Sequence, residues 1–328
     1  MTSLRWLPRI GLAGLLMLAA IYLVGYFTGV ANRTWIFGGA LAFPVVSFIL
    51  AATAALLLLV LSVSIRTWRT RANIVSTASA AVTFGLTAVL LIATTPSPAQ
   101  IADLPDRGDG FDVRALAWNV KGKVPADAMA DLMTRTDADV AAFAELRSGG
   151  SASSFARGRH PEGYQLFHGI YTSVTLLVAD RLGEYRLAAA DEDGAWTGVV
   201  AEPLDPTSDS PRIVAVHATR MALDPTIGAQ GWRRALTWIT RQCAETNTIA
   251  LGDFNAGPAN FTDGRLGECQ LHSLGTSAPT WPSTVPVPLG ATIDHVLATP
   301  DWTPTYARTL DVPASGTDHR PVFSVLTR

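Results

Sequence analysis

Acidic residues are absent from the first hundred positions of this 328-residue chain, where the only charged side chains are six arginines. Residues 101–328 therefore hold all 27 acidic residues against 19 basic ones, which gives that part a net charge of −8. Lysine is also scarce, with only Lys121 and Lys123 in the whole chain. Because nucleic-acid affinity depends largely on neutralisation of phosphates by Lys and Arg, this balance argues against tight nucleic-acid binding, although it does not exclude a nuclease.

The absence of acidic residues leaves three uncharged apolar stretches, each long enough for the ~20 residues that a membrane-spanning helix needs. They cover residues 10–30, about 38–64, and 74–95. A buried bundle of helices in a soluble protein is the alternative, and a cleaved signal peptide could explain the first stretch alone. That stretch is longer than the usual core of a signal peptide, however, and two more follow it. The sequence therefore predicts a membrane anchor of three transmembrane helices in residues 1–95.

The arginines of this anchor indicate its orientation, because cytoplasmic loops are enriched in Lys and Arg. Two arginines precede the first stretch, three lie between the second and third, and a single one lies between the first and second. In that order they are Arg5 and Arg9, then Arg66, Arg69 and Arg71, and finally Arg33. The segment after the third stretch begins with Asp103 and Asp106. We therefore expect a multi-pass protein of the cell membrane with a cytoplasmic N-terminus and an extracytoplasmic catalytic domain.

Beyond a short Pro-, Asp- and Gly-containing linker at 96–110, residues 111–328 alternate between β-rich runs and amphipathic helical runs. Strands are expected at 113–120, 140–143, 173–178, 197–201, 213–216, 248–251, 292–298 and 321–326, and helices at 126–134 and 229–243. This is more strands than a single parallel doubly wound sheet would show, so the pattern predicts an α/β sandwich.

Eight polar side chains lie where these expected strands begin or end. They are Asn119, Glu145, His217, Asp253, Asn255, Asp294, Asp318 and His319. Reacting groups of α/β folds gather at such strand ends. Oxygen ligands from Asn, Glu and Asp suit a hard cation such as Mg²⁺ or Mn²⁺, and histidines close to acids suit proton transfer and stabilisation of phosphoryl charge.

Taken singly, these residues have structural alternatives. Asn119 and Asp318 could cap turns, Glu145 could be an ordinary surface acid, His217 could be a buried and satisfied histidine, and Asp294 could pair with a nearby arginine. The ordered series favours a functional site over these alternatives. Its most specific part is Gly252-Asp253-Phe254-Asn255, because glycine allows a close approach of the backbone while two polar side chains enter one site.

The series resembles the endonuclease/exonuclease/phosphatase superfamily, which includes DNase I-like nucleases, neutral sphingomyelinases and inositol-polyphosphate 5-phosphatases. The matching segments fall in family order across about 111–328. They are Trp118-Asn119-Val120, Glu145, Val216-His217, Gly252-Asp253-Phe254-Asn255, Ile293-Asp294-His295 and Thr317-Asp318-His319-Arg320-Pro321. Thr280-Trp281-Pro282 also looks like a family element, or else is a tryptophan packed on a loop. Ala144 departs from the pattern, since many relatives have Gln before the Glu.

The resemblance implies an α/β (α+β) four-layer sandwich with two mixed sheets, and a site that uses Mg²⁺ or Mn²⁺. Glu145 would hold the metal with help from Asn119 and Asp318. Asp253 would orient or deprotonate the attacking water, Asn255 and His217 would bind phosphate oxygens, and His319, oriented by Asp294, would act in proton transfer or charge stabilisation.

The layout of three spans followed by this domain resembles the actinomycete membrane proteins related to VanJ, which are associated with resistance to glycopeptide antibiotics. That resemblance implies a phosphorylated or pyrophosphorylated lipid of the cell envelope as substrate, and an anchored domain meets lipid headgroups at high effective concentration. A DNase I-like extracytoplasmic nuclease and a non-catalytic binding domain are the alternatives. The bilayer is the expected partner, and nothing in the sequence indicates a protein partner.

The chain has two cysteines, Cys243 and Cys269. Outside the cytoplasm an even pair favours a disulfide, which here would close a loop of about 26 residues. In the cytoplasm both would be free thiols. Their spacing does not match a zinc site.

Overall fold

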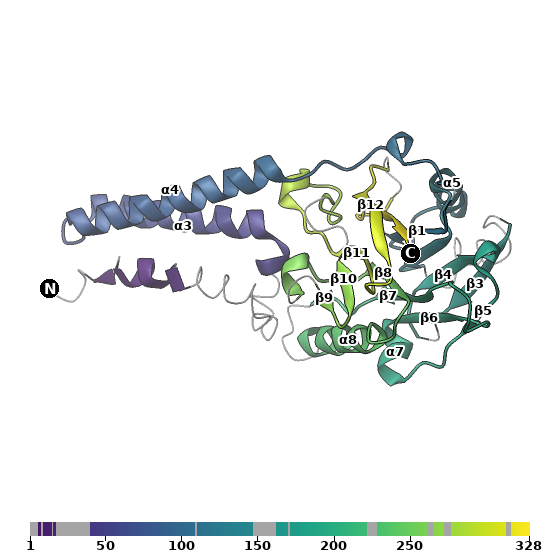
Figure 1. Cartoon of the computed structure of the whole chain (residues 1–328). Helices are drawn as coiled ribbons and strands as arrows, with labels where there is room; N and C mark the ends of the chain where they lie inside the picture. Colours follow the sequence, from purple (N-terminus) through teal and green to yellow (C-terminus); the bar gives the residue numbers. More distant parts are fainter. Residues whose placement is uncertain are drawn as a thin grey trace.

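Two long helices project from a sandwich of two β-sheets in the computed structural model of this chain (Figure 1). The structure describes residues 6–7, 9–14, 16–17, 40–108, 110–146, 162–169, 171–221, 228–261, 265–271, 277–312 and 316–328. The projecting helices are α3 (Pro44–Ser64) and α4 (Arg71–Thr94). Pro44 begins α3 where its missing N–H costs nothing, and Thr70 caps α4 by accepting the backbone N–H of Asn73.

Both projecting helices are long and apolar enough to cross a membrane, by length and composition. Their large apolar side chains are exposed, as at Leu57 on α3 and Leu86 on α4, which is the arrangement expected for side chains that face lipid tails. Among the described residues these are the two helices of this kind. The first expected span, 10–30, lies for the most part outside the described residues, so three spans remain a prediction.

The described part of that first stretch packs beside the other two helices. Leu12 packs against a small cluster formed by Ala55 of α3 with Ala80 and Phe84 of α4. Arg9 Nε donates to Asn73 Oδ1 at 3.4 Å. The N-terminal segment therefore meets the helix pair close to the α3–α4 turn, at the end that Figure 1 shows to be far from the sheets.

The segment expected to be a linker is packed on the sandwich. Ala99 donates its N–H to Thr309 O at 2.8 Å, and Ile101 in the short helix η2 (Ile101–Asp103) packs against the outer core with Leu104. Arg107 pairs with the carboxylate of Asp139. These contacts attach the chain firmly to the sheet directly after it leaves α4.

The first sheet has six strands in the order β12-β13-β1-β2-β4-β3. Their bounds are β1 (Asp112–Asn119), β2 (Val140–Ala144), β3 (Tyr164–His168), β4 (Thr175–Ala179), β12 (Thr303–Thr309) and β13 (Val322–Thr327). The pair β1–β2 is parallel and the others are antiparallel. The carboxyl ends of β1 and β2 therefore meet at one edge of this sheet.

The second sheet has seven strands in the order β5-β6-β7-β8-β11-β10-β9. Their bounds are β5 (Tyr185–Leu187), β6 (Gly198–Pro203), β7 (Arg212–His217), β8 (Thr248–Asp253), β9 (Arg265–Leu266), β10 (Cys269–Leu271) and β11 (Asp294–Ala298). Here β7–β8 is the parallel pair. The two sheets face each other, with β1 against β8 and β11.

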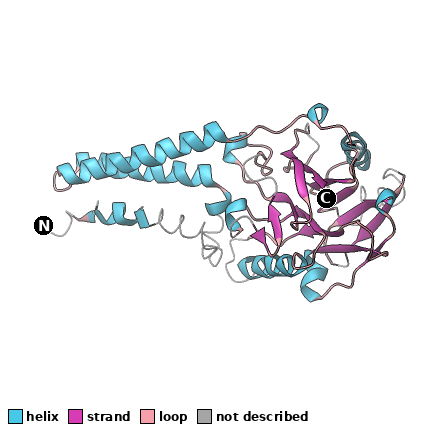
Figure 2. Ribbon diagram, in the orientation of Figure 1, coloured by secondary structure: helices cyan, strands magenta, loops and turns pink. Residues whose placement is uncertain are grey.

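Each face of each sheet has a distinct packing partner, which produces four layers (Figure 2). Small and β-branched side chains such as Ala117 and Ile213 fill the space between the sheets. The helix α5 (Ala126–Thr136) covers the outer face of the first sheet, and α8 (Gly228–Gln242) covers that of the second. The expected α+β sandwich with two mixed sheets is confirmed.

The remaining elements are short. They are α7 (Glu192–Thr197), η4 (Asp180–Leu182), η5 (Pro258–Asn260) and η6 (Val287–Leu289). The expected strands and helices are found with small shifts at their ends, but α7 and the strands β3, β5, β9, β10 and β12 were not predicted. Most of these strands have two to five residues, and Pro304 in β12 argues against a strand except at a sheet edge, which is where β12 lies.

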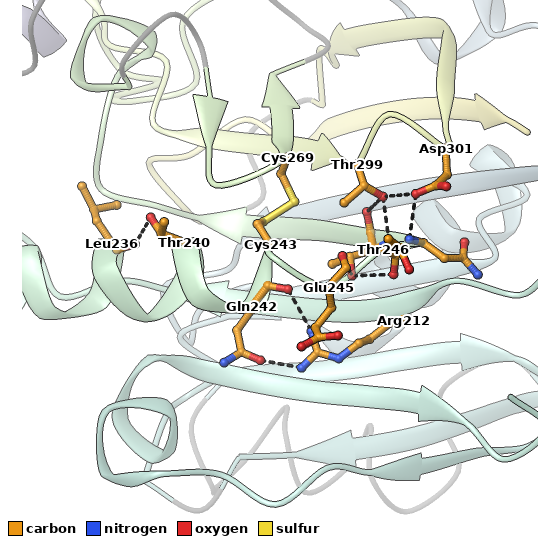
Figure 3. The surroundings of a disulfide bond; sticks show 12 residues. Arg212, Leu236, Thr240, Gln242, Cys243, Glu245, Thr246, Cys269, Thr299 and Asp301 are labelled. Atoms are coloured by element: carbon orange, nitrogen blue, oxygen red, sulfur yellow. Dashed lines mark hydrogen bonds between the residues drawn. A yellow bond between two sulfur atoms is a disulfide. The ribbon is translucent and has the colours of Figure 1, made fainter.

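The two cysteines form a disulfide. Cys243 follows the last residue of α8 and Cys269 begins β10, so the bond ties the outer helix to the second sheet (Figure 3). Arg212 of β7 donates to Gln242 at the same helix end. This bond agrees with the disulfide that the even number of cysteines favoured over free thiols.

Removing this disulfide should lower the stability of the domain. The bond spans 26 residues of sequence, and closing a loop of that length restricts the unfolded chain by roughly 3–4 kcal/mol. We expect the Cys243→Ala/Cys269→Ala double variant to lose about that much unfolding free energy, measured by urea unfolding of the full chain in detergent. Reductant should destabilise the wild-type chain by a similar amount and leave the double variant unchanged. Equal unfolding curves for wild type with and without reductant would contradict the prediction.

Candidate active site

The two parallel strand pairs bring four of the eight expected side chains to one edge of the sandwich. Asn119 ends β1 and Glu145 directly follows β2 in the first sheet. His217 and Asp253 end β7 and β8 in the second sheet and are partners in the parallel register. Asp294 begins β11 opposite Asp253 in the antiparallel register. The topology therefore gathers residues separated by up to 175 positions, because equivalent ends of parallel strands lie together.

The backbone adopts unusual conformations at three residues of this edge, Glu145, Gly252 and Asn255. Glu145 and Asn255 both have left-handed φ values, +56° and +47°, which turn the chain sharply as each strand ends. Gly252 has φ +141°, and a Cβ there would lie 2.1 Å from Val216 O. Only glycine is compatible with this approach of β8 to β7, as the sequence pattern indicated.

Asn119 connects the two sheets at this edge. Its buried amide donates from Nδ2 to Glu145 Oε1 at 3.1 Å and to Asp253 Oδ2 at 2.8 Å. Asn119 Oδ1 in turn accepts the backbone N–H of Lys121 at 3.0 Å. The amide is thus satisfied on both sides and holds two carboxylates of different sheets at a fixed separation.

His319 and Asp294 form a buried pair. His319 Nδ1 lies 2.9 Å from Asp294 Oδ2, and Trp118 Nε1 donates to His319 O at 3.0 Å. Burial lowers the pKa of the imidazole, but the charge of Asp294 and its hydrogen bond outweigh burial and raise this pKa to about 9. His319 is therefore protonated at neutral pH and carries a positive charge into the site.

Asp253 is almost completely buried beside this pair. Its Oδ1 accepts the N–H of Asn255 at 2.8 Å. Burial, followed by the negative charge of Asp294, raises the pKa of the Asp253 carboxyl. Ligand atoms of Asp253, Asp294 and His319 all lie within 4.8 Å of one another. These three residues, which the resemblance assigned to catalysis, form the carboxylate–histidine cluster of the described residues.

Two further expected residues flank this cluster. His217 Nδ1 lies 3.1 Å from Ser173 Oγ, and its Nε2 lies 3.7 Å from Glu145 Oε1. Asn255 Nδ2 donates to Ala218 O at 2.8 Å. Both side chains are therefore oriented by partners of their own and reach the pocket from the second sheet.

Asp318 is held by side chains that the sequence did not assign to the site. Lys121 Nζ lies 2.7 Å from Asp318 Oδ2, and Trp281 Nε1 donates to the same oxygen at 3.3 Å. Partial burial raises the pKa of Asp318, but the hydrogen bond from Lys121 and other favourable contacts outweigh it, so the pKa is lowered. The position of Trp281 beside Asp318 distinguishes the two interpretations of its motif, since this tryptophan contacts the site.

Six of the eight expected residues line one open pocket of about 920 Å³. They are Glu145, His217, Asp253, Asn255, Asp318 and His319. Asn119 and Asp294 lie directly behind them, hydrogen-bonded to Asp253 and to His319. Lys121 and Ser173 are among the pocket residues that the sequence did not indicate, because their roles come from partners far away in the chain.

The charges of this pocket fit a divalent cation. Four carboxyl groups converge here, and the raised pKa of Asp253 means that its ionised form is disfavoured as the side chains stand. A nearby cation would relieve that repulsion. Carboxylate and amide oxygens are the donors that Mg²⁺ and Mn²⁺ prefer. Glu145, Asn119 and Asp318 are the residues that the resemblance assigns to it, whereas the described residues whose ligand atoms lie within 4.8 Å of one another are Asp253, Asp294 and His319.

Comparison with known families identifies the chain. The pattern of the endonuclease/exonuclease/phosphatase family matches residues 116–319, which is more than half of the sequence and runs from the middle of β1 to His319. This protein belongs to the endonuclease/exonuclease/phosphatase family. Members of this family hydrolyse phosphoester bonds and are typically dependent on a divalent metal, which agrees with the carboxylate–histidine cluster.

Solved structures with this fold include several family members. An endonuclease/exonuclease/phosphatase from Beutenbergia cavernae is 13% identical with a TM-score of 0.50, over 66% of this chain and 71% of that one. D. rerio TDP2, complexed with a single-strand DNA product, is 14% identical with a TM-score of 0.50, over 66% of this chain and 99% of that one. At these identities the similarity establishes the fold alone. Comparison with curated proteins finds no significant match.

The neighbour of Asp294 makes the stability of this edge dependent on pH. His295 is fully buried, and its Nε2 lies 2.7 Å from Ala256 O in the loop after Asp253. Burial lowers the pKa of this imidazole to about 4. The unfolded chain therefore binds a proton near pH 6.5 that the folded chain does not bind until about pH 4, so stability falls as the pH falls through this window.

We expect acidification from pH 7 to pH 5 to cost the wild-type domain about 2 kcal/mol through His295. The His295→Gln variant, which cannot take up the proton, should lose correspondingly less over the same range. Urea unfolding of both proteins at the two pH values measures the difference. Parallel losses in the two proteins would show that His295 is not the titrating group.

Proposed function

We propose that this protein is a divalent-metal-dependent phosphoesterase anchored in a cell membrane, which acts outside the cytoplasm on a phosphorylated or pyrophosphorylated lipid of the cell envelope. One observation carries the proposal. The pocket that collects Glu145, Asp253 and His319 is also lined by Ala42 and Phe43. These two residues directly precede α3, one of the two apolar helices that project from the domain (Figure 1). A phosphate held there is close to the surface of the membrane that those helices would cross.

Each side chain of the pocket has its own role in the proposed hydrolysis of a phosphoester. Asp253, whose pKa is raised by burial and by the charge of Asp294, accepts the proton of the attacking water as a general base. His319 is held through Nδ1 by Asp294, which leaves Nε2 to donate to the phosphate. His217 and Asn255 bind phosphate oxygens from the second sheet. These fixed donors stabilise charge that develops on phosphorus.

A bound Mg²⁺ or Mn²⁺ would polarise the phosphoryl group and neutralise its charge. Glu145, Asn119 and Asp318 are the proposed ligands. Asn119 has a second task that needs no metal, because its amide fixes the distance between Glu145 and Asp253. The proton acceptor and the proposed metal ligand are therefore positioned by the same side chain.

The arrangement of charges supports the proposed orientation in the membrane. Arg66 and Arg69 lie in the turn between α3 and α4, Arg71 begins α4, and Arg9 contacts Asn73 beside that turn. These arginines therefore gather at the end of the helix pair opposite the sandwich, as a cytoplasmic end requires. The disulfide supports an extracytoplasmic domain as well, because such bonds persist in oxidising compartments.

The acidic charge of the domain and its two lysines favour a lipid substrate over a nucleic acid. Arg220, exposed at the pocket, is suited to a second phosphate of a diphosphate. The overall layout, which resembles the VanJ-related membrane proteins, supports the same substrate class. A nuclease activity is the second candidate, because a TDP2 of the same fold is complexed with a DNA product.

The direct test is phosphate release from undecaprenyl pyrophosphate by the full chain purified in detergent. With Mg²⁺ we expect turnover that EDTA abolishes. Asp253→Ala should lower kcat by at least about 100-fold, which is the usual effect of removing a general base. Asp131→Ala is the matched control, because this acid is exposed on α5 and pairs only with Arg135 among the described residues.

The outcomes separate the candidate functions. Cleavage of DNA in the same buffer, without release from the lipid, would replace the proposal by a nuclease. Hydrolysis of neither substrate at any Mg²⁺ or Mn²⁺ concentration would reject catalysis and favour a binding domain. Full activity in Asp253→Ala would reject the assignment of the base while leaving the reaction intact.

A further inference from the structure

The pocket is not built from the catalytic domain alone. Ala42 and Phe43, which directly precede α3, line it together with Asp318 and His319. Phe43 is half-buried and ends the segment that leads into an apolar helix. One wall of the catalytic pocket therefore belongs to the membrane anchor.

This wall is docked closely on the domain. A Cβ at Gly257 would lie 3.0 Å from Ala42 Cα, so the backbones of the anchor and of the loop after β8 are in direct contact. The short helix η6 contacts both α3 and α4. The anchor thus meets the domain at two places, the loop after β8 and η6.

Phe43 is connected to the reacting groups through a single ring. Its phenyl packs edge-on against Trp281, with ring centroids 5.8 Å apart. Trp281 donates to Asp318 and its ring lies 6.2 Å from that of His319. The ring of Trp281 is therefore the link between Phe43 of the anchor and the pocket residues Asp318 and His319.

A polar floor beside an apolar wall matches a substrate with the same division. If a bulky polar group separated the phosphate from the lipid chain, that group would lie against Phe43 and Trp281. Burial of a polar group against apolar side chains costs free energy, because its hydrogen bonds to water are lost. A phosphate joined directly to an apolar alcohol places its first carbons against this wall instead. The membrane helices would then receive the rest of the chain without exposing it to water.

We propose that Phe43, with Ala42, is a specificity-determining contact that selects phosphate or diphosphate esters of long apolar alcohols. The inference rests on the proposed lipid phosphoesterase activity and extends it, because it makes the anchor part of the substrate site and not only a tether. Phe43 touches the apolar part of the substrate and takes no part in the transfer of protons or of the phosphoryl group.

The experiment compares two diphosphate probes that share a reacting group, a long-chain prenyl diphosphate and methyl diphosphate, on the full chain in detergent. Phe43→Ala should lower kcat/KM for the prenyl probe ten-fold or more, mainly through KM, because it removes buried apolar contact that is equal in ground and transition states. The ratio of kcat/KM between prenyl and methyl probes should fall by a similar factor. Phe43→Leu, which keeps an apolar side chain, should retain the wild-type ratio within about three-fold.

Leu57→Ala is the matched control, since Leu57 is exposed on α3, the helix that Phe43 precedes, and lies outside the pocket lining. It should leave the ratio unchanged. An unchanged ratio in Phe43→Ala, with the wild type active on the prenyl probe, would overturn the inference while the proposed function stands. Equal loss on both probes would also overturn it, because Phe43 would then support the site and not select the substrate. A wild type inactive on both probes would reject the proposed function and the inference with it.

Discussion

The hydrogen bond between Asn119 and Asp253 joins the two sheets where the catalytic groups gather. It is possible because small residues such as Ala115 and Ala117 fill the inner core and let β1 approach β8. A buried amide that serves two carboxylates is costly to leave unsatisfied, so the register of both sheets is constrained at this edge. The positions of the other site residues depend on this register. Glu145 follows β2 and His319 precedes β13, the two neighbours of β1, while Asp294 begins β11, a neighbour of β8.

The site balances an excess of negative charge in two ways. Asp294 is hydrogen-bonded to His319 and stabilises its positive charge. Asp318 is paired in a similar way with the ammonium group of Lys121. Among the described residues no cation forms an ion pair with Asp253, and its pKa is raised by burial and by the charge of Asp294. The proposed proton acceptor and the proposed metal site both follow from this imbalance of charge, which the low dielectric of a buried site strengthens.

The anchor gives this family fold a setting of its own. In a soluble phosphoesterase the wall beside Trp281 would face water, whereas here Phe43 covers it. Under the proposed function, apolar helices that end beside this pocket place the two parts of an amphiphilic phosphate in two suitable environments at once. The segment around Ala99 hydrogen-bonds to Thr309 and Asp311 directly after α4, so packed contacts fix this helix relative to the first sheet.

The eight residues that the structure brings together could be named from the sequence because each lies near the end of a locally recognisable strand. The glycine at position 252 likewise indicated the close approach of the backbone there. The apolar runs of α3 and α4 were equally clear, since helix length and composition are local properties. The edge strands β5, β9 and β12 were not, because short strands are stabilised by a neighbour and not by their own pattern. Only the tertiary structure decided that Lys121 meets Asp318 and that Phe43 reaches Trp281, because these contacts join positions about 200 residues apart. No local signal in either segment specifies its partner.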